Sequence, residues 1–134
     1  MKRILTFCCF LLLFSAVSKS QHKLEIEISG LRNDKGKVML QLFDSGEHVI
    51  DSLMTPISSK KCNVSIPGLP AGSYAVRYYH DENLNGKMET NMFGKPTEGY
   101  GFSNNVTGKF GPPPFKKWLF EITDDKKISL VPVY

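Results

Sequence analysis

Alternation of apolar and polar residues is the feature that most constrains how this chain can fold. Leu24, Ile26 and Ile28 alternate with charged residues, the period-two pattern of a strand with one buried face. The pattern returns in five later segments, at residues 38–42, 62–66, 73–80, 118–123 and 128–133. After residue 20 no segment has the periodicity of a helix longer than one turn. Short strands with frequent turns predict an all-β protein, a single antiparallel Greek-key β-sandwich of about seven strands.

The turns between these segments predict which strands are neighbours. Residues 32–36 (Arg-Asn-Asp-Lys-Gly) favour a tight turn because Asn, Asp and Gly tolerate positive φ, so residues 23–44 are expected to form a hairpin. Residues 118–133 are expected to form a second hairpin. Residues 45–60 are expected to contain an irregular edge strand, since Pro56 cannot donate a ladder hydrogen bond.

One segment, residues 81–114, breaks the regular spacing of strands. It is rich in glycine and proline and poor in strand-forming residues. Irregular loops of this length are uncommon inside a compact domain, and usually they have a function or their own packing. The sequence therefore predicts one long irregular loop and makes it the first place to look for a binding site.

The loop opens with the ligand spacing of a calcium-binding loop. Oxygen donors recur at every second position and Gly86 supplies a sharp turn at the sixth. The candidate metal ligands are Asp81, Asn83, Asn85, Lys87 (through its backbone carbonyl) and Glu89. The twelfth position, which usually carries a bidentate Glu, is Met92, so Ca²⁺ affinity is expected to be weak, on the order of 10⁻⁴–10⁻³ M. Glu98 or Asp34 could complete the coordination, and a plain turn of Asx type is the alternative.

Aromatic residues gather in the second half of the loop and just beyond it. They suit a face that stacks on sugar rings or holds a peptide, and they equally suit the completion of a hydrophobic core. The candidate partner-binding residues are Tyr100, Phe102, Asn104 and Phe110.

The sequence contains no recognisable catalytic motif. A nucleophile elbow, a His-Glu-x-x-His pair and a phosphate-binding glycine loop are all missing, so no catalytic residue is predicted. A small hydrolase with chemistry around His80, Asp81 and Glu89 is the least favoured alternative. Cys62 is the only cysteine after residue 20, and its place on an apolar face predicts a buried thiol.

Residues 1–20 have the pattern of a signal peptide. Lys2 and Arg3 precede an apolar run at 4–14, and Ser18 and Ser20 lie at −3 and −1 of a cleavage site. The run is too short to span a bilayer, which takes about 20 apolar residues. We therefore expect export to the periplasm or the extracellular space, a single domain at 21–134 and no membrane span.

Removal of the signal peptide also removes most of the net charge of +4. Three of the 17 basic residues are lost, which leaves 14 beside 13 acidic ones, a net charge of +1. The remaining lysines are spread along the chain and form no basic stripe, so a nucleic-acid partner is not expected. We expect a monomer whose partner is a protein or a glycan of the cell envelope.

Four blocks of sequence, taken together and in order, carry a family resemblance. They are residues 68–76, 80–87, 99–105 and 110–113, and they resemble an exported bacterial family known as domain of unknown function 2141. The resemblance covers nearly all of the chain after residue 20. The Leu-Pro-x-Gly-x-Tyr segment at 69–74 is similar to that of prealbumin-like and collagen-adhesin B-type modules, which implies an immunoglobulin-like or prealbumin-like sandwich.

Three functions remain open at this point. The first is an exported, non-catalytic module that binds Ca²⁺ weakly at 81–89 and contacts a partner through the long loop. The second is a carbohydrate- or peptide-binding module that uses the aromatic residues of 100–118. The third is the small hydrolase.

Overall fold

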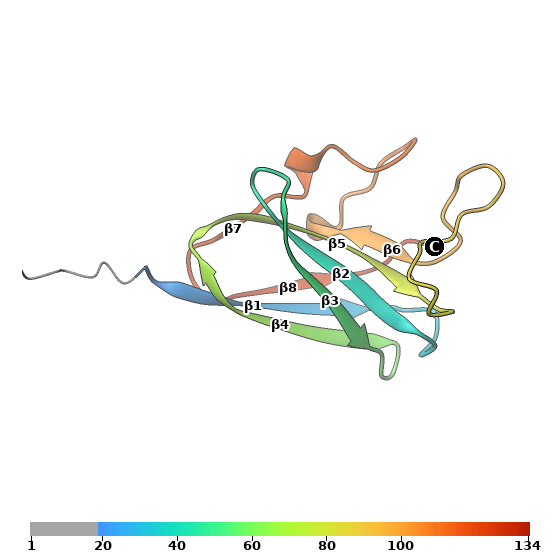
Figure 1. Cartoon of the computed structure of the whole chain (residues 1–134), viewed down its shortest axis with the longest axis horizontal. Helices are drawn as coiled ribbons and strands as arrows, with labels where there is room; N and C mark the ends of the chain where they lie inside the picture. Colours follow the sequence, from blue (N-terminus) through green and yellow to red (C-terminus); the bar gives the residue numbers. More distant parts are fainter. Residues whose placement is uncertain (1–18) are drawn as a thin grey trace, which may run out of the picture.

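The computed structural model describes residues 19–134 and shows two β-sheets packed face to face (Figure 1). The predicted signal peptide falls almost entirely on residues 1–18, which lie outside the described part. The smaller sheet has three strands in the order β4-β1-β8: β1 (Gln21–Ser29), β4 (Lys61–Pro70) and β8 (Lys126–Leu130). No helix in the described part is long and apolar enough to cross a membrane.

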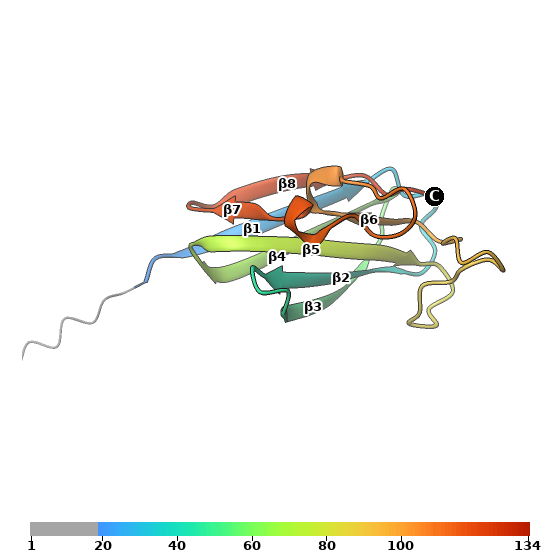
Figure 2. The same cartoon turned by 90° about the horizontal axis from the view of Figure 1, so that it is seen from above.

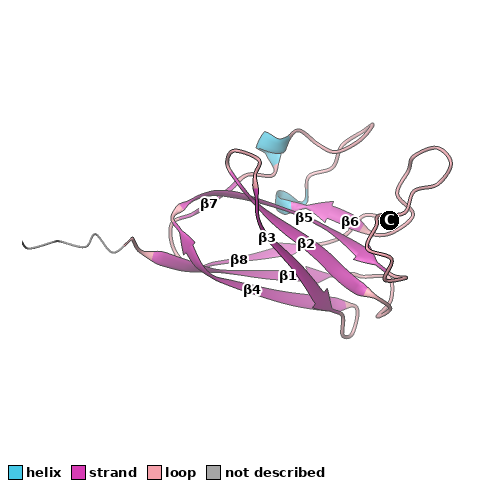
Figure 3. Ribbon diagram, viewed as in Figure 1, coloured by secondary structure: helices cyan, strands magenta, loops and turns pink. Residues whose placement is uncertain are grey.

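The larger sheet has five strands. Its members are β2 (Lys37–Asp44), β3 (Val49–Pro56), β5 (Gly72–Asp81), β6 (Tyr100–Phe102) and β7 (Phe120–Ile122). The order is β3-β2-β5-β6, and β7 also pairs with β5. The described residues include two short 3-10 helices. One of them, η2 (Phe115–Lys117), lies on the outer side of this sheet (Figure 3), while η1 (Ser103–Asn105) follows β6 directly and is hydrogen-bonded through Asn105 to Ser129 of β8. The predicted all-β sandwich is confirmed, with eight strands in residues 19–134.

The predicted strand partners are wrong at both ends of the chain. β1 and β2 do not form a hairpin, because they belong to opposite sheets. β7 and β8 are separated in the same way, and β8 runs parallel to β1, so the sandwich is not wholly antiparallel. The predicted edge strand is confirmed as β3, with Pro56 as its last residue. The predicted loop 81–114 is interrupted by β6 and η1, which divide it into two loops.

The apolar faces of both sheets meet in one core. Leu24, Ile26 and Ile28 of β1 are all at most 1% exposed, as their alternation predicts. Cys62 is also buried in this core, which confirms the expected buried thiol, and burial raises its pKa to about 11. A thiol held in its neutral form is a poor nucleophile, so Cys62 acts as a small hydrophobic side chain.

A second, smaller core lies on the outer side of the five-stranded sheet. Phe43 and Ala75 of the sheet are covered by Phe102 and Trp118, and the Phe102 and Trp118 rings lie 4.3 Å apart between centroids. The indole N–H of Trp118 donates to the carbonyl of Pro113 (3.0 Å). This outer core fixes the second loop, residues 106–114, against the sheet.

Replacing Tyr78 with phenylalanine is expected to leave the free energy of unfolding unchanged or to raise it by up to about 1 kcal/mol. The Tyr78 hydroxyl is the only buried side-chain polar atom in the described part that lacks a hydrogen-bond partner, so its removal relieves a desolvation penalty. Tyr74→Phe is the matched control, since the Tyr74 hydroxyl donates to the carbonyl of Pro70 (2.7 Å) and its loss should cost about 1 kcal/mol. Urea unfolding measures both, and a loss above about 1 kcal/mol for Tyr78→Phe would contradict this account.

Candidate binding groove and cation loop

The outer face of the five-stranded sheet forms the floor of a groove. Residues directly opposite one another on paired strands share a face, so strand register identifies the floor. One row across the sheet runs Met54, Met39, Tyr79, Tyr100, and the next runs Ser52, Gln41, Arg77, Phe102. The intervening residues, such as Leu40 and Tyr78, face the core. The floor therefore combines aromatic rings with two planar polar side chains.

Arg77 is held in a defined position on this floor. Its Nε donates to Oε1 of Gln41 (2.7 Å), and its guanidinium carbon lies 5.2 Å from the centroid of the Phe43 ring. Across residues 19–134, Arg77 makes no ion pair. The guanidinium is thus oriented by neighbours that leave its charge uncompensated.

Two loops form the walls of the groove. One wall comes from residues 86–96 and the other from residues 108–112, and both rise above the five-stranded sheet in Figure 1. Seen from above in Figure 2, the first loop projects beyond the ends of β2 and β5. Phe93 on the first wall is 87% exposed, and Phe110 on the second is fully exposed. Together with the floor, the walls enclose a volume of about 1280 Å³. This volume exceeds the 300–1,000 Å³ typical of small-molecule pockets and suits a ligand of several linked units.

The candidate partner-binding residues divide into two groups. Tyr100, Phe102 and Phe110 line the groove, although Phe102 is mostly buried against Trp118. Asn104 does not line it. Its side-chain amide donates to the carbonyls of Lys117 and Leu119 (2.9 Å each), and in this way it fastens η1 to the segment that leads into β7. Asn104 is therefore a structural residue.

The start of the candidate cation loop (residues 81–89, called the cation loop below) is organised around Asp81. Its side chain is only 2% exposed, with Oδ1 accepting the backbone N–H of Asn85 (3.2 Å) and Oδ2 that of Gly86 (2.8 Å). Gly86 has φ 74°, the positive value expected at the sharp turn. Hydrogen bonds to the Asp81 carboxylate thus bring together positions one, five and six of the predicted loop, which are Asp81, Asn85 and Gly86.

The other predicted ligands converge on Glu89. The side-chain amides of Asn83 and Asn85 both donate to Oε1 of Glu89, while their oxygens accept backbone N–H groups two residues further on. The amide nitrogens therefore face the carboxylate, and coordination of a cation by these amides requires each of them to turn over. Lys87 follows in the same turn, with its backbone N–H bonded to Asn85.

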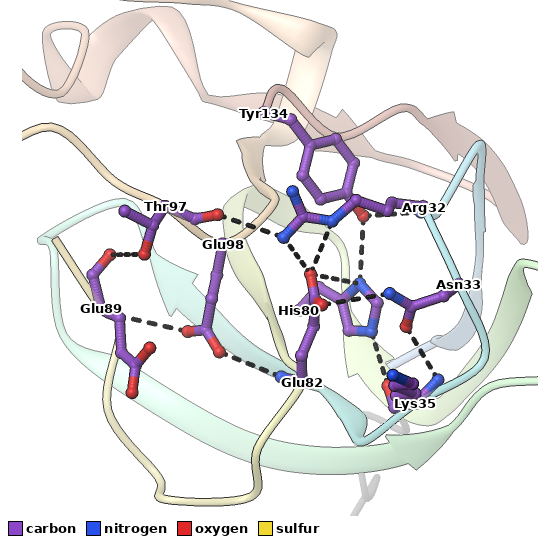
Figure 4. Close-up of polar contacts among 9 residues, drawn as sticks. All are labelled: Arg32, Asn33, Lys35, His80, Glu82, Glu89, Thr97, Glu98 and Tyr134. Atoms are coloured by element: carbon purple, nitrogen blue, oxygen red, sulfur yellow. Dashed lines mark hydrogen bonds and ion pairs between the residues drawn. The ribbon is translucent and has the colours of Figure 1, made fainter. Parts of the chain in front are cut away.

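Glu98 also contacts the cation loop, although it lies outside the predicted ligand spacing of residues 81–89. It is 3% exposed and accepts the backbone N–H groups of Glu82 (3.0 Å) and Glu89 (3.3 Å), as Figure 4 shows. Asp34, the other residue considered for this role, instead binds the backbone of Ser59 and Lys60. In the described part of the chain, no three His, Cys, Asp or Glu side chains are arranged as a metal-binding group, so a cation here needs the amide and backbone oxygens.

His80 has a structural role next to this loop. It is completely buried; Nε2 donates to the carbonyl of Lys35 (2.6 Å), and Nδ1 accepts the Tyr134 hydroxyl (3.0 Å), as Figure 4 shows. Since that hydroxyl also accepts the backbone N–H of Arg32, its own proton goes to Nδ1. Both ring nitrogens are occupied, so the geometry does not offer His80 as a general base to a substrate.

An ion pair extends this network toward the loop. Nε of Arg32 donates to Oε1 of Glu82 (2.9 Å), and the amide of Asn33 donates to Oε2 (3.1 Å). Burial by itself would raise the pKa of Glu82, but these hydrogen bonds outweigh it and hold the pKa below its ordinary value. Glu82 is therefore a charged anchor that ties the loop to the turn before β2.

The fold and the groove define a class: a β-sandwich with a ligand-sized groove on the outer face of one sheet. The family model described as "Uncharacterized protein conserved in bacteria (DUF2141)" matches residues 26–129, and the chain belongs to this family. No curated protein matches the sequence.

Proposed function

We propose that this protein is an exported, non-catalytic binding domain that takes up a glycan in the groove. The observation that carries the proposal is the floor, where Tyr79 lies beside Tyr100 and the next row places Arg77 beside Gln41. Tyrosines offer a broad apolar face with a polar tip, which suits the apolar faces and hydroxyl edges of sugar rings. Planar amide and guanidinium groups next to such rings supply directional hydrogen bonds.

A glycan suits this floor better than an extended peptide does. Peptides commonly add a strand to an open sheet edge, where unpaired backbone groups are available. The floor strands β2 and β5 are each paired on both sides, so their backbone hydrogen bonds are already made. Recognition on this face must therefore use side chains, and stacking on aromatic rings is the mode they offer.

Replacing Tyr100 with alanine is expected to weaken glycan binding on the order of tenfold, because the stacked ring loses a contact of about 1.4 kcal/mol. The measurement begins with the wild-type protein on an array of cell-wall oligosaccharides, followed by calorimetry with the strongest binder. Ile50→Ala is the control, since Ile50 is exposed on β3 and lies outside the groove. Binding to peptides on a parallel array, with none to the oligosaccharides, would contradict the proposal.

A second proposed property is weak Ca²⁺ binding in the 81–89 loop, which supports the first wall of the groove. The buried carboxylates of Asp81 and Glu98 favour it, since neither makes an ion pair with any residue of 19–134. Buried charges are usually paired or coordinate metals. Gly86 and Met88, next to the candidate ligands, line the groove, so an ordered loop holds this wall in place.

Calcium at about 100 times its dissociation constant is expected to stabilise the protein by about 2.7 kcal/mol, a rise of several degrees in Tm. Differential scanning calorimetry in about 10–100 mM CaCl2, against a chelator, measures this rise. Glu89→Gln keeps the shape of the exposed side chain and should reduce the calcium-dependent part of the rise. Asp51→Asn, on β3, should keep it. An identical Tm with calcium and with chelator would contradict the property.

A further inference from the structure

The charged residues that line the groove are all basic. They are Arg77 on the floor, Lys95 on the first wall and Lys109 on the second, and the lining contains no Asp or Glu. The chain after residue 20 is nearly neutral in total, with 14 basic and 13 acidic residues. A purely cationic lining is therefore a local property of the groove, and it favours a ligand that carries negative charge.

We infer that the ligand is a glycan that carries carboxylate groups, with Arg77 as the residue that binds a carboxylate. This inference rests on the proposed glycan-binding function. The guanidinium is fixed through Nε by Gln41 and through its face by Phe43, which leaves both terminal nitrogens without a hydrogen-bond partner among residues 19–134. The two terminal N–H groups of a planar guanidinium match the two oxygens of a carboxylate, and the orientation of the Arg77 guanidinium is already set before binding.

The spacing of the floor suits a sugar acid. Arg77 and Tyr79 are two residues apart on β5, so they lie about 7 Å apart on the same face. A sugar ring stacked on Tyr79 and Tyr100 therefore holds an in-plane carboxylate substituent next to Arg77. Arg77 is exposed to solvent, and its contact with a carboxylate would be a charge-assisted hydrogen bond. Lys95 and Lys109, on the loops, supply a longer-range attraction that salt screens.

The test compares an acidic oligosaccharide with its neutral ester by calorimetry. The probes are tetragalacturonate and tetramannuronate, each as the free acid and as the methyl ester, which keeps the rings and removes the charge. The wild-type protein is expected to bind at least one acid at least tenfold more tightly than its ester. Arg77→Gln should bring the acid and the ester within about twofold of each other while the ester still binds. Arg77→Lys should restore little of the preference for the acid, because lysine keeps the positive charge but lacks the two parallel N–H donors of the guanidinium.

Lys127→Gln is the matched control, since it removes one positive charge from β8 of the opposite sheet and lies outside the groove. It should retain most of the preference for the acid at about 0.5 M NaCl, where long-range attraction is screened. Equal binding of acid and ester by the wild type would overturn this inference and leave the glycan groove standing. Preferential binding of a phosphorylated oligosaccharide, with competition by inorganic phosphate, would also overturn it. Failure of every glycan to bind would remove the proposed function itself.

Discussion

Replacing Trp118 with alanine is expected to lower the free energy of unfolding by about 4 kcal/mol, in the range measured for buried aromatic residues. Trp118 is 5% exposed, and it packs against Phe43, Phe102 and Phe115. Its removal leaves a cavity in the outer core and releases the carbonyl of Pro113 from its hydrogen bond. Because this core holds both Phe102 and the second wall, glycan binding should be lost together with stability.

Phe110→Ala provides the matched control for this prediction. Phe110 belongs to the same segment and is also aromatic, but it is fully exposed. Its removal should change the free energy of unfolding by less than about 0.5 kcal/mol. The difference is measured by urea unfolding of both variants. Unfolding is monitored by tryptophan fluorescence for Phe110→Ala and by circular dichroism for Trp118→Ala. Similar losses in the two variants would contradict the outer core.

Replacing Gly36 with alanine is expected to lower the free energy of unfolding by about 3 kcal/mol. The alanine would have to adopt a left-handed backbone conformation, and its Cβ would overlap backbone atoms, which cannot move aside as the end of a side chain can. Gly36 has φ 67°, and a Cβ there would lie 1.8 Å from the backbone oxygen of Asp81. It would also lie 2.7 Å from Cα of Glu82. The turn before β2 therefore rests directly on the backbone that starts the cation loop. The variant should displace Asp81 and weaken any calcium-dependent stabilisation.

Gly94→Ala separates the two contributions to this cost. Gly94 has a comparable φ of 76°, but a Cβ there meets no atom within 4 Å. The Gly94→Ala substitution should lower the free energy of unfolding by about 1 kcal/mol, from the backbone conformation alone. Thermal unfolding of the two variants, each in calcium and in chelator, tests both the packing and the link to the loop. Equal destabilisation by both substitutions would show that Gly36 does not contact the loop as described.

The sequence predicts which face of each strand is buried, but not which strand lies beside it. Ile26 and Leu40 were both placed correctly on apolar faces, and both are buried. Yet β1 and β2 reach the shared core from opposite sheets. Alternation reports burial, and burial is the same from either side of a sandwich. A short turn between two strands therefore does not decide between a hairpin and a crossing from one sheet to the other.

The cation loop was more predictable than the groove because its contacts are local. Asp81 binds the backbone of residues four and five positions further on, so its spacing alone identifies the turn. Glu98 joins the loop from 16 residues beyond Glu82, and only the pairing of β6 with β5 places it there. The calcium and partner hypotheses themselves stay predictions.

The groove could be predicted only in part, because its floor is assembled from four strands. The aromatic pattern identified Tyr100 and Phe110, both of which line it. Gln41, Arg77 and Tyr79 were missed as site residues, since their meeting depends on the register of β2, β5 and β6. One signal was present: β5 carries aromatic or planar side chains on both faces, and only one face can be in the core.

The most direct measurement is an NMR titration of the isotopically labelled protein, residues 21–134, with the oligosaccharide that binds most tightly. If the glycan occupies the groove, the amide signals of Arg77, Tyr79 and Tyr100 should shift together with those of residues 86–96 and 108–112. The signals of β1, β4 and β8, on the opposite sheet, should remain in place. Saturable shifts confined to that opposite sheet, or none at all at millimolar glycan, would contradict the account.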